Sequence, residues 1–415
     1  IKLAKQISDR IPGSVVPVFW MASEDHDIDE IDHLFYKGEK YACEFNSNGA
    51  TGRLNSVPVA AMIDQLQEAN KELLYNDLLK FFREAYSSSD TLAGATRLIM
   101  NKLFGHLGLV VIDADDQELK AAFASEMEQE ISDQPTIRSV SNTNDLLEER
   151  YKLVVNPRDV NLFYLENEGR YRIKPEGEGR FMLVDDNRKF SRSELIQSLR
   201  TDPQKFSPNV ILRTVYQEKI LPNVCYIGGP GEISYWLQFK GVFDQFEIPF
   251  PCVVLRNSFL LIDAKTEKKI KTLGLDGPEL FRSKEDVTDE LLENTGELFD
   301  EKEYHKKLEE VFLELKNAAI RLDKTLQYPV EGELKKAKQS VDKLRLKFKR
   351  ALKRREQESM SRLIYVHDQL FPDGSLQERK ANILNFMDSA DNEIIRYLYE
   401  ITEPLDHDIK VVFYE

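Results

Sequence analysis

Residues 221–246, "LPNVCYIGGPGEISYWLQFKGVFDQF", place a short apolar run, a glycine-rich turn and an amphipathic segment in direct succession. The apolar run has the length of a buried strand, and the spacing after the glycines favours a helix. Another apolar run, "PCVVL", follows at 251–255. A strand, a helix and a second strand in this order are typical of a parallel sheet with helices on its faces.

The same alternation extends from Val15 to about Asp276. "VVPVFWMA" precedes "EDHDIDEIDHLF", and "LGLVVIDA" follows the helical pattern "LAGATRLIMNKLFG". We therefore predict an α/β fold with a doubly wound parallel sheet over residues 1–284. Residues 39–54 and 156–190 instead alternate apolar and polar side chains around glycine-containing turns, so hairpins inserted into this core are expected there.

A different pattern begins after about Lys284. Apolar residues recur at alternating steps of three and four through 308–322 and again through 334–351. Pro329 and Gly332 lie between the two repeats and are expected to break the helix. Two long helices joined by a short break predict an antiparallel hairpin with coiled-coil packing.

This predicted coiled coil covers residues 285–370, and residues 371–415 are expected to pack back on the core. The two arms of the coiled coil carry opposite charge. The acidic residues of the first arm are Glu285, Asp286, Asp289, Glu290, Glu293, Glu297, Asp300, Glu301 and Glu303. The basic residues of the second arm are Lys343, Arg345, Lys347, Lys349, Arg350, Lys353, Arg354 and Arg355. Complementary solvated arms are one interpretation. The other is a basic helix that also touches a phosphate or a second subunit.

Composition limits the class of protein. A chain of 415 residues suggests two or three domains, and its net charge of −15 argues against general nucleic-acid binding. No apolar run is long enough to span a membrane. Cys43, Cys225 and Cys252 stand far apart without a C-x-x-C pair, which is typical of a cytoplasmic protein rather than a disulfide scaffold or zinc site.

The stretch "SEDHDIDEIDH" at 23–33 crowds acidic residues and two histidines directly after an apolar strand. If Ser23 caps a helix, Glu24 and Asp25 occupy its first turn, where the helix dipole favours carboxylates. One face of that helix would carry His26, Asp29, Glu30 and His33. A solvated acidic helix start is therefore one interpretation of the stretch.

A functional site is the second interpretation, since ligands bind beyond the carboxyl ends of the strands in an open parallel sheet. Carboxylates there could hold a substrate amine, accept its proton or carry Mg²⁺, and His26 could act as an acid, a base or a phosphate donor. The spacing of His26 and His33 does not match a helical zinc pair, and no metal ligand is assigned.

The turn "GGPGE" joins the predicted strand to a helix that begins near Glu232. The backbone N–H groups of Gly228, Gly229 and Gly231 could approach an anion or a flat ring, and the helix N-terminus adds partial positive charge. Neither G-x-G-x-x-G nor G-K-[ST] is present, so a plain tight turn remains the alternative.

Two further stretches contribute candidates. Asn209, Arg213 and Gln217 follow one another at steps of four and share one face of a helix or strand. Arg256 and Ser258 follow the strand in "VVLRNS". Arginine suits a carboxylate or phosphate because it is permanently charged and can bind with two N–H groups. A surface or ion-pair role is the other interpretation of both arginines.

These motifs occur together in a known family. The motifs are "PVFWMASEDHDIDEI", "NLFYL", "SPNVILR", "YIGGPGEISYW" and "LFPDGSLQERKANILNF". With these motifs, in this order over nearly the whole chain, the sequence resembles the cysteine-adding enzymes of bacillithiol biosynthesis. The resemblance implies a Rossmann-like nucleotidylyltransferase core, similar to class I aminoacyl-tRNA synthetases, with inserted subdomains and a coiled coil that supports a homodimer.

The reaction implied by the resemblance joins the carboxyl of L-cysteine to the amino group of glucosaminyl-malate. By analogy the carboxyl is activated by ATP as an acyl-adenylate. Family members begin with a segment containing a "TGQQ"-type loop, and this sequence starts after it, inside the helical pattern "IKLAKQISDRI". We therefore expect an upstream segment, and with it part of the nucleotide or substrate site, to be missing.

The resemblance also implies residue roles. Asp25, His26 and Asp27 are expected at the reacting end. The binding set is Glu24, Asn209, Arg213, Gly228, Gly229, Gly231, Glu232, Tyr235, Arg256 and Ser258. In the mechanistic hypothesis an acidic residue of the EDHD group deprotonates the glucosamine ammonium, while Arg213 or Arg256 engages a malate carboxylate or a phosphate.

Two alternatives stay open at this point. One is a Mg²⁺-dependent phosphoryl- or nucleotidyl-transfer enzyme that uses Glu24 to Asp27 as ligands. The other is a non-catalytic nucleotide-responsive scaffold whose coiled coil recruits a partner.

Overall fold

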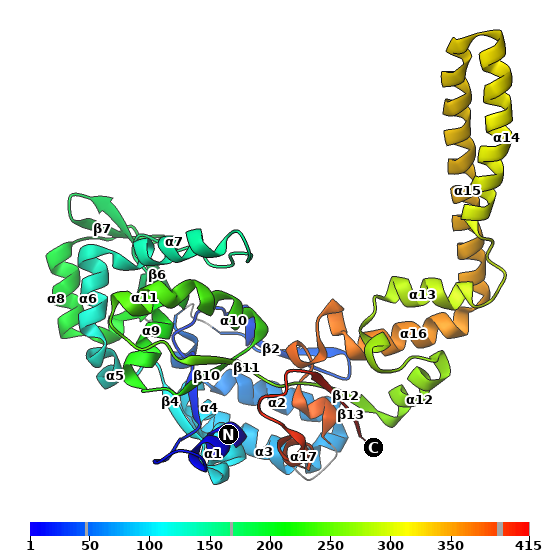
Figure 1. Ribbon diagram of the computed structural model, residues 1–415. Coiled ribbons are helices and arrows are strands. Elements are labelled where there is room, and N and C mark those ends of the chain that lie inside the picture. Colours follow the sequence, from blue (N-terminus) through cyan, green and yellow to red (C-terminus); the bar gives the residue numbers. More distant parts are fainter. Residues whose placement is uncertain (46–48, 167–168, 388–392, 415) are drawn as a thin grey trace. The chain divides into compact units, whose positions relative to one another are not determined.

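The fold is described from a computed structural model, which describes residues 1–45, 49–166, 169–387 and 393–414 (Figure 1). These residues form two compact units. The first contains Ile1–Ser258 and Ala381–Ile409, and the second contains Phe259–Lys380 and Lys410–Glu415.

Parallel strand pairs carry the α/β part of the first unit. β1 (Val18–Met21) pairs in parallel with β4 (Val110–Asp113), and β10 (Cys225–Gly228) pairs in parallel with β11 (Cys252–Leu255). Helices separate the paired strands in the chain, as the alternation of apolar runs and amphipathic segments predicts. The expected Rossmann-like α/β core is confirmed.

Helices account for much of the first unit (Figure 1). Their bounds are α1 (Lys2–Ser8), α2 (Val57–Ala69), α3 (Asp77–Ser88), α4 (Leu92–Phe104), α5 (Gln117–Ala122), α6 (Ala124–Asp133), α7 (Pro135–Leu147), α8 (Arg192–Thr201), α9 (Val210–Ile220), α10 (Pro230–Trp236), α11 (Lys240–Gln245) and α17 (Glu393–Ile401). The main core of this unit gathers large side chains that are fully buried, among them Phe123, Tyr216, Trp236 and Phe243.

Antiparallel strands interrupt the α/β pattern in both predicted regions. Within the described residues, β5 (Leu162–Glu166), β6 (Gly169–Gly177), β7 (Arg180–Leu183), β8 (Lys189–Ser191) and β9 (Phe206–Pro208) form one sheet in the order β8-β7-β6-β5-β9. The earlier hairpin joins β2 (His33–Tyr36) to β3 (Glu39–Ala42). It begins ahead of the predicted range 39–54, and residues 46–48 of that range lie outside the described residues.

The second unit contains the coiled coil. Its elements are β12 (Ser258–Asp263), α12 (Ala264–Leu273), α13 (Lys284–Glu293), α14 (Glu301–Leu322), α15 (Gln327–Arg355), α16 (Gln357–Leu370) and β13 (Ile409–Tyr414), and β12 pairs with β13. α14 and α15 run side by side as an antiparallel hairpin (Figure 1). The coiled-coil prediction is confirmed.

The position of the break was predicted wrongly. α14 ends at Leu322, and a short 3₁₀ helix (Lys324–Leu326) leads into α15, which already contains Pro329 and Gly332. Proline is tolerated in the first turn of a helix, where its missing N–H has no intrahelical partner. The turn forms where Asp323 caps it by accepting a hydrogen bond from the Thr325 N–H.

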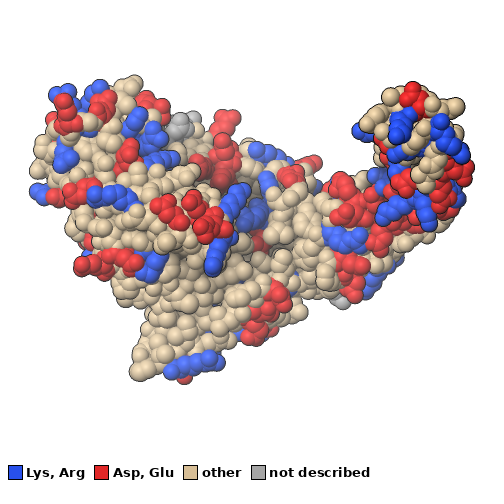
Figure 2. Space-filling view, turned by 45° about the horizontal axis from the view of Figure 1, so that its top comes forward, with Lys and Arg blue, Asp and Glu red and all other residues tan. Residues whose placement is uncertain are grey.

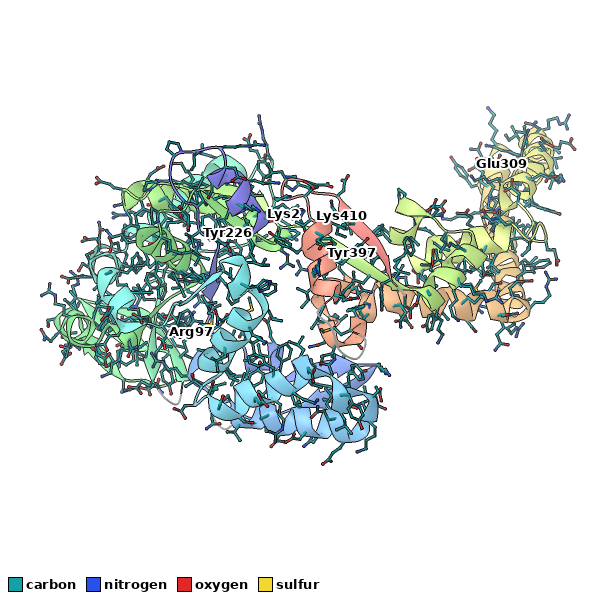
Figure 3. All side chains as sticks on the ribbon, turned by 90° about the horizontal axis from the view of Figure 1, so that it is seen from below. Lys2, Arg97, Tyr226, Glu309, Tyr397 and Lys410 are labelled. Atoms are coloured by element: carbon teal, nitrogen blue, oxygen red, sulfur yellow. The ribbon has the colours of Figure 1, made fainter. Side chains whose placement is uncertain are left out.

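Ion pairs connect the two oppositely charged arms. Arg345 lies 2.7 Å from Glu301, Lys349 lies 2.7 Å from Asp289, and Arg355 lies 2.5 Å from Glu297. Glu309, labelled in Figure 3, also pairs with a lysine of α15. Basic and acidic side chains accordingly intermix along this part of the surface at the right of Figure 2. Complementary arms therefore account for much of the charge asymmetry.

Among the residues that the structure describes, no helix has both the length and the apolar character needed to cross a bilayer.

Candidate functional site

The site lies at the neighbouring carboxyl ends of β1 and β4. Because the two strands are parallel and Met21 pairs with Asp113, the residues that follow them emerge at one edge. The Ser23 hydroxyl donates a hydrogen bond to the Asp113 carboxylate. The same carboxylate accepts the backbone N–H of Asp115 at 2.9 Å, so it ties the two loops together.

A buried charge network lies behind this edge. Lys120 of α5 is buried, and its Nζ lies 2.6 Å from the Glu24 carboxylate and 2.7 Å from Asp115. Arg53 donates a further hydrogen bond to Asp115 from Nη2 at 2.8 Å. Glu24 therefore faces a fixed cation in the protein interior, and its carboxylate is engaged before any ligand arrives.

Burial and charge act differently on the two carboxylates of this network. Burial raises the pKa of Glu24 above its ordinary value and outweighs the opposing effect of Lys120. Burial also acts to raise the pKa of Asp115, but hydrogen bonds and charge from Arg53 and Lys120 outweigh it and lower the pKa. Asp115 is thus the firmly ionised partner of Lys120.

The segment that follows Glu24 is open to solvent. The side chains of Asp25, His26 and Asp27 are 52%, 42% and 60% exposed. His26 Nδ1 lies 3.3 Å from the Asp25 carboxylate and 3.9 Å from the Asp27 carboxylate. This arrangement places two carboxylates and an imidazole within reach of a ligand.

The helix predicted to begin after Ser23 is absent. The chain instead turns through Asp25 to Asp27, forms a short 3₁₀ helix (Ile28–Glu30), and enters β2 at His33. Ser23 gives its hydroxyl to Asp113 rather than to a helix end, and Asp25 accepts the His26 N–H. Aspartates that bond nearby backbone in this way compete with helix formation.

Arg170 of β6 connects the inserted sheet to the acidic segment. Its side chain is only 9% exposed, and it donates to the Asp25 carboxylate at 3.2 Å and to the Pro208 carbonyl at 3.1 Å. The guanidinium lies 4.0 Å from the ring centroid of Phe163, a cation–π distance. Burial lowers the pKa of Arg170, against the raising effect of Glu24 and Asp25.

These residues enclose a cleft of about 430 Å³ within the first unit. It is lined by Ala22, Glu24, Asp25, His26, Asp27, Ala114, Val154, Val155, Asn156, Arg158, Phe163, Arg170, Pro208, Asn209, Val210 and Arg213. The predicted residues Glu24 to Asp27, Asn209 and Arg213 thus come together, although nearly two hundred positions separate the two stretches. Carboxylates and arginines both line this cleft, and Arg170 contacts Asp25 within it.

Helix α9 supplies two of the predicted residues. Asn209 is its N-cap and accepts the backbone N–H of Ile211 and Leu212, while its own amide donates to Asn161 at 2.8 Å. Arg213 lies one turn further along. Gln217, the third residue of the series, donates to Glu218 at 3.1 Å and does not line the cleft.

The GGPGE turn adjoins the cleft through Arg213. Arg213 donates to the Tyr235 hydroxyl at 3.0 Å and lies 3.9 Å from the Glu232 carboxylate. Glu232 accepts the Gly229 N–H at 2.9 Å and the hydroxyl of Tyr226, the residue labelled in Figure 3, at 2.6 Å. Burial acts to raise the pKa of Glu232, but these bonds and Arg213 lower it.

Other predicted binding residues surround this turn. Gly228 ends β10, Gly231 stands in the first turn of α10, and Arg256 donates its backbone N–H to the Gly228 carbonyl at 2.9 Å. Ser258 begins β12. The carboxylate of Glu232 takes up the Gly229 N–H that was expected to meet an anion, so this turn is largely satisfied by its own helix.

The acidic segment also offers a possible set of metal ligands. Ligand atoms of Asp25, His26 and Asp27 all lie within 4.8 Å of one another. All three residues are exposed, and Arg170 already brings a permanent positive charge to Asp25. The donor set suits a hard cation such as Mg²⁺ only when a ligand supplies further oxygens.

Sequence reasoning did not identify Arg158, Arg170, Lys120 and Asp115. Asp115 closely follows the apolar run "LGLVVIDA", so the rule that selected Glu24 could have found it. Arg170 lies in a strand of the inserted sheet, and its place opposite Asp25 depends on how that sheet folds back. No local pattern marks it.

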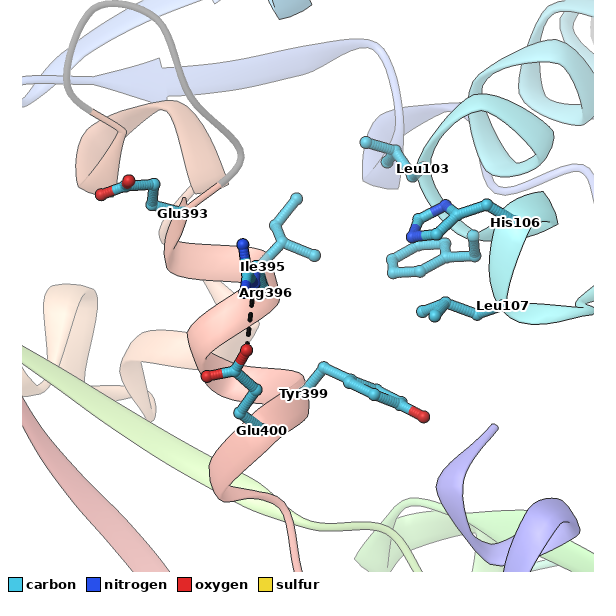
Figure 4. Close-up of a pocket in the computed structure, with 9 residues that line it drawn as sticks. Leu103, His106, Leu107, Glu393, Ile395, Arg396, Tyr399 and Glu400 are labelled. Atoms are coloured by element: carbon cyan, nitrogen blue, oxygen red, sulfur yellow. Dashed lines mark hydrogen bonds and ion pairs between the residues drawn. The ribbon is translucent and has the colours of Figure 1, made fainter.

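A second cleft, of about 550 Å³, lies between α17 and the end of α4 with its following turn (Figure 4). Leu103, Leu107 and Ile395 line it, and Arg396 pairs with Glu400 at 2.9 Å along one edge. Nearby, the Lys2 ammonium donates to the Glu400 carbonyl at 2.9 Å (Figure 3). This cleft shares no lining residue with the acidic cleft.

Together these features define a Rossmann-like α/β protein with an acidic and arginine-lined cleft at its strand ends, followed by a coiled-coil domain. Residues 1–257 match the family model described as bacillithiol biosynthesis BshC, N-terminal Rossmann-like domain. Residues 259–414 match the BshC C-terminal coiled-coil domain. The chain therefore belongs to the BshC family of bacillithiol biosynthesis.

Full-length relatives agree with this assignment. The protein named "Putative cysteine ligase BshC" of Flavobacterium johnsoniae is 37% identical over 99% of this chain and 78% of its own length. The proteins of the same name from Cytophaga hutchinsonii and Flavobacterium psychrophilum are 35% and 36% identical, over 100% and 98% of this chain and 78% and 76% of their own lengths.

Proposed function

We propose that this chain is a cysteine ligase that joins the carboxyl of L-cysteine to the amino group of glucosaminyl-malate, forming an amide in the last step of bacillithiol biosynthesis. The name shared by its relatives supports cysteine as the added group. The observation that carries the rest is that carboxylates and arginines line one cleft together.

The charge pattern of the cleft complements glucosaminyl-malate. Asp25 and Asp27 are more than half exposed and can hold an ammonium group. Arg158 and Arg213 line the same cleft and can receive the malate carboxylates with paired N–H groups. A substrate with an amine at one end and two carboxylates at the other can bind both kinds of side chain in this cleft.

The acidic residues of the cleft can also prepare the amine for reaction. An ammonium ion has no free electron pair, so a base must remove a proton before the nitrogen attacks a carboxyl carbon. Asp25 accepts from Arg170, which fixes its carboxylate in place, and His26 Nδ1 lies 3.3 Å from that carboxylate. In this proposal Asp25 orients the amine and the Asp25–His26 pair takes its proton.

ATP is the proposed cofactor, because amide formation from a free carboxylate requires an activated carboxyl. The arginines of the cleft provide the cationic side chains that would hold its phosphates. When bound, ATP would supply a leaving group at the cysteine carboxyl. Mg²⁺ is expected to accompany it, with Asp27 as the carboxylate that the proton transfer leaves available.

Reconstitution tests this proposal. The chain, extended by any upstream segment of its natural protein, is incubated with cysteine, glucosaminyl-malate and each nucleotide, and products are identified by mass spectrometry. Release of AMP would indicate an adenylate route and release of ADP an acyl phosphate. Absence of the amide product under all nucleotides would contradict the proposal.

Variants of the acidic segment locate the chemistry. Asp25→Asn and His26→Ala are expected to abolish product while leaving the folded state intact. Asp29→Asn is the matched control, because Asp29 is exposed on the same segment but does not line the cleft. Normal turnover in both site variants, or equal loss in Asp29→Asn, would refute the assigned roles.

We also propose that the coiled coil supports a homodimer. Val311, Leu315 and Leu322 of α14 are 56%, 51% and 84% exposed, although the heptad pattern predicts an apolar seam. Leu344 and Phe348 of α15 are also about half exposed. A second copy of the chain would cover this apolar surface.

Sedimentation measurements test the dimer. Val311→Lys with Leu315→Lys is expected to convert the dimer to a monomer, whereas Glu314→Lys, an exposed change on the same helix, is expected to leave it intact. A wild-type monomer at all concentrations would contradict the proposal.

The free thiols of Cys43, Cys225 and Cys252 support a reducing, cytoplasmic location.

A further inference from the structure

A small basic pocket lies beside the acidic cleft, between the loop that precedes β5 and the strand β6. Its volume is about 180 Å³. It is lined by Ile137, Pro157, Arg158, Asp159, Val160, Arg172, Ile173, Lys174 and Pro175. Arg158 lines both this pocket and the acidic cleft, so the two spaces share a wall.

Three cations line this pocket: Arg158, Arg172 and Lys174. Among the described residues, no carboxylate forms an ion pair with Arg158, Arg172 or Lys174. Asp159 is the one acidic residue of the lining, so the pocket keeps an excess of positive charge. In a chain with a net charge of −15, a group of uncompensated cations around a cavity is unexpected.

Strand geometry holds these cations on one side of the inserted sheet. Alternate residues of a strand share a face, so Arg170, Arg172 and Lys174 form a row along β6, while Ile173 between them is buried in the core. Phe163 pairs with Arg172 across β5 and β6. The row therefore runs from the acidic cleft at Arg170 into the basic pocket.

Phe163 also holds Arg158 in place. The Arg158 guanidinium lies 5.5 Å from its ring centroid, while Arg170 contacts the same ring at 4.0 Å. Burial and the neighbouring charge of Arg172 both lower the pKa of Arg158. An anion between these side chains would relieve that repulsion.

We propose that this pocket is an oxyanion subsite that binds one phosphate-like or carboxylate group of a ligand whose remainder lies in the acidic cleft. The pocket is much smaller than the 430 Å³ cleft, so it fits an anionic group rather than a whole nucleotide. Arg158, Arg172 and Lys174 bind the anion through charge-assisted N–H bonds. Only the identity of the ligand that carries the anion rests on the proposed ligase function.

Titration with inorganic phosphate tests the subsite without any turnover. Arg172→Ala and Lys174→Ala are each expected to weaken phosphate binding about tenfold, the effect of losing one charge-assisted contact. Arg180→Ala is the matched control, because Arg180 carries the same charge on the same sheet but does not line the pocket. Circular dichroism establishes that each variant is folded.

Unchanged phosphate affinity in both pocket variants would overturn the proposal, as would equal weakening in Arg180→Ala, which would indicate only a general charge effect. Binding of ATP and of glucosaminyl-malate to Arg172→Ala then identifies the source of the anion. Weaker ATP binding alone indicates a nucleotide phosphate, and weaker glucosaminyl-malate binding alone indicates a malate carboxylate. If neither changes, the subsite does not serve the ligase reaction.

Discussion

Lys120 and Glu24 form a 2.6 Å ion pair in which the side chains are 1% and 6% exposed. The pair lies directly beneath the exposed Asp25, His26 and Asp27. Glu24 is thus the point where the solvent-facing acidic segment is joined to the interior of the protein. The chemistry proposed for this segment depends on that attachment, because Asp25, His26 and Asp27 are not part of a helix.

Removing the cation should destabilise the fold. In Lys120→Met the carboxylates of Glu24 and Asp115 lose a buried partner, and breaking such a pair costs about 3–5 kcal/mol. Thermal or urea unfolding measures the loss. Lys80→Met is the control, since Lys80 pairs with Asp77 at the surface and is expected to change stability by less than about 1 kcal/mol. Equal effects of the two substitutions would show that the buried network contributes little.

Arg170 should control the position of Asp25. Arg170→Ala removes the donor that holds the Asp25 carboxylate, and misplacing a reacting group typically costs about 100-fold in rate. Arg170→Lys keeps the charge but lacks the planar group that reaches both Asp25 and Pro208, so it should restore only part of kcat/KM.

Arg188→Ala is the control for this comparison, because Arg188 pairs with Glu166 on the same sheet and does not line the cleft. Full activity in Arg170→Ala would exclude the positioning role. Complete rescue by lysine would instead assign Arg170 a role as a charge alone.

The amino-acid sequence predicts the local features of this protein well. The apolar runs that form β1, β4, β10 and β11, and the heptads that form α14 and α15, depend on neighbours a few positions away. The acidic segment was predicted at a strand's carboxyl end for the same reason. The helix predicted to follow Ser23 does not form, because the contact of Ser23 with Asp113 diverts the side chain that would have capped it.

The site contacts that the sequence does not predict join residues that are far apart in the chain. Arg170 meets Asp25 across an inserted sheet, and three strands and several helices separate Lys120 from Glu24 in the chain. The sequence around Arg170 and around Lys120 does not differ from that around the many surface cations of the chain. Each gains its role only when folding brings a carboxylate next to it.

Stability should fall as pH rises from about 4.5 to about 7 because of Glu218. Burial raises the pKa of this carboxyl from 4.5 to about 7, despite hydrogen bonds from Asn223 and Gln217. The folded state therefore holds a proton that the unfolded state has lost between these pH values, so the free energy of unfolding decreases through that window.

Glu218→Gln removes this dependence. The amide oxygen can still accept from Asn223 and Gln217, and no charge must be buried at high pH. Between about pH 5 and about pH 8 the variant should lose less thermal stability than the wild type. Glu126→Gln serves as the control, because Glu126 is also buried but its carboxylate pairs with Lys219 at 3.0 Å. Parallel pH curves for wild type and Glu218→Gln would contradict the assignment.

Gly52 should be required for the shape of the acidic loop. A Cβ added at this position would stand 2.4 Å from Ser23 Cβ and 2.8 Å from the Ser23 carbonyl oxygen, which accepts the Gly52 N–H. Gly52→Ala must push Ser23 and the residues after it away from Asp113, at a cost of about 1–3 kcal/mol and with loss of ligase activity. Gly332→Ala is the matched control, because no atom lies within 4 Å of its added Cβ and alanine favours the helix α15. Calorimetry and turnover measurements should therefore distinguish Gly52→Ala from Gly332→Ala. A fully active, stable Gly52→Ala protein would show that the loop tolerates displacement.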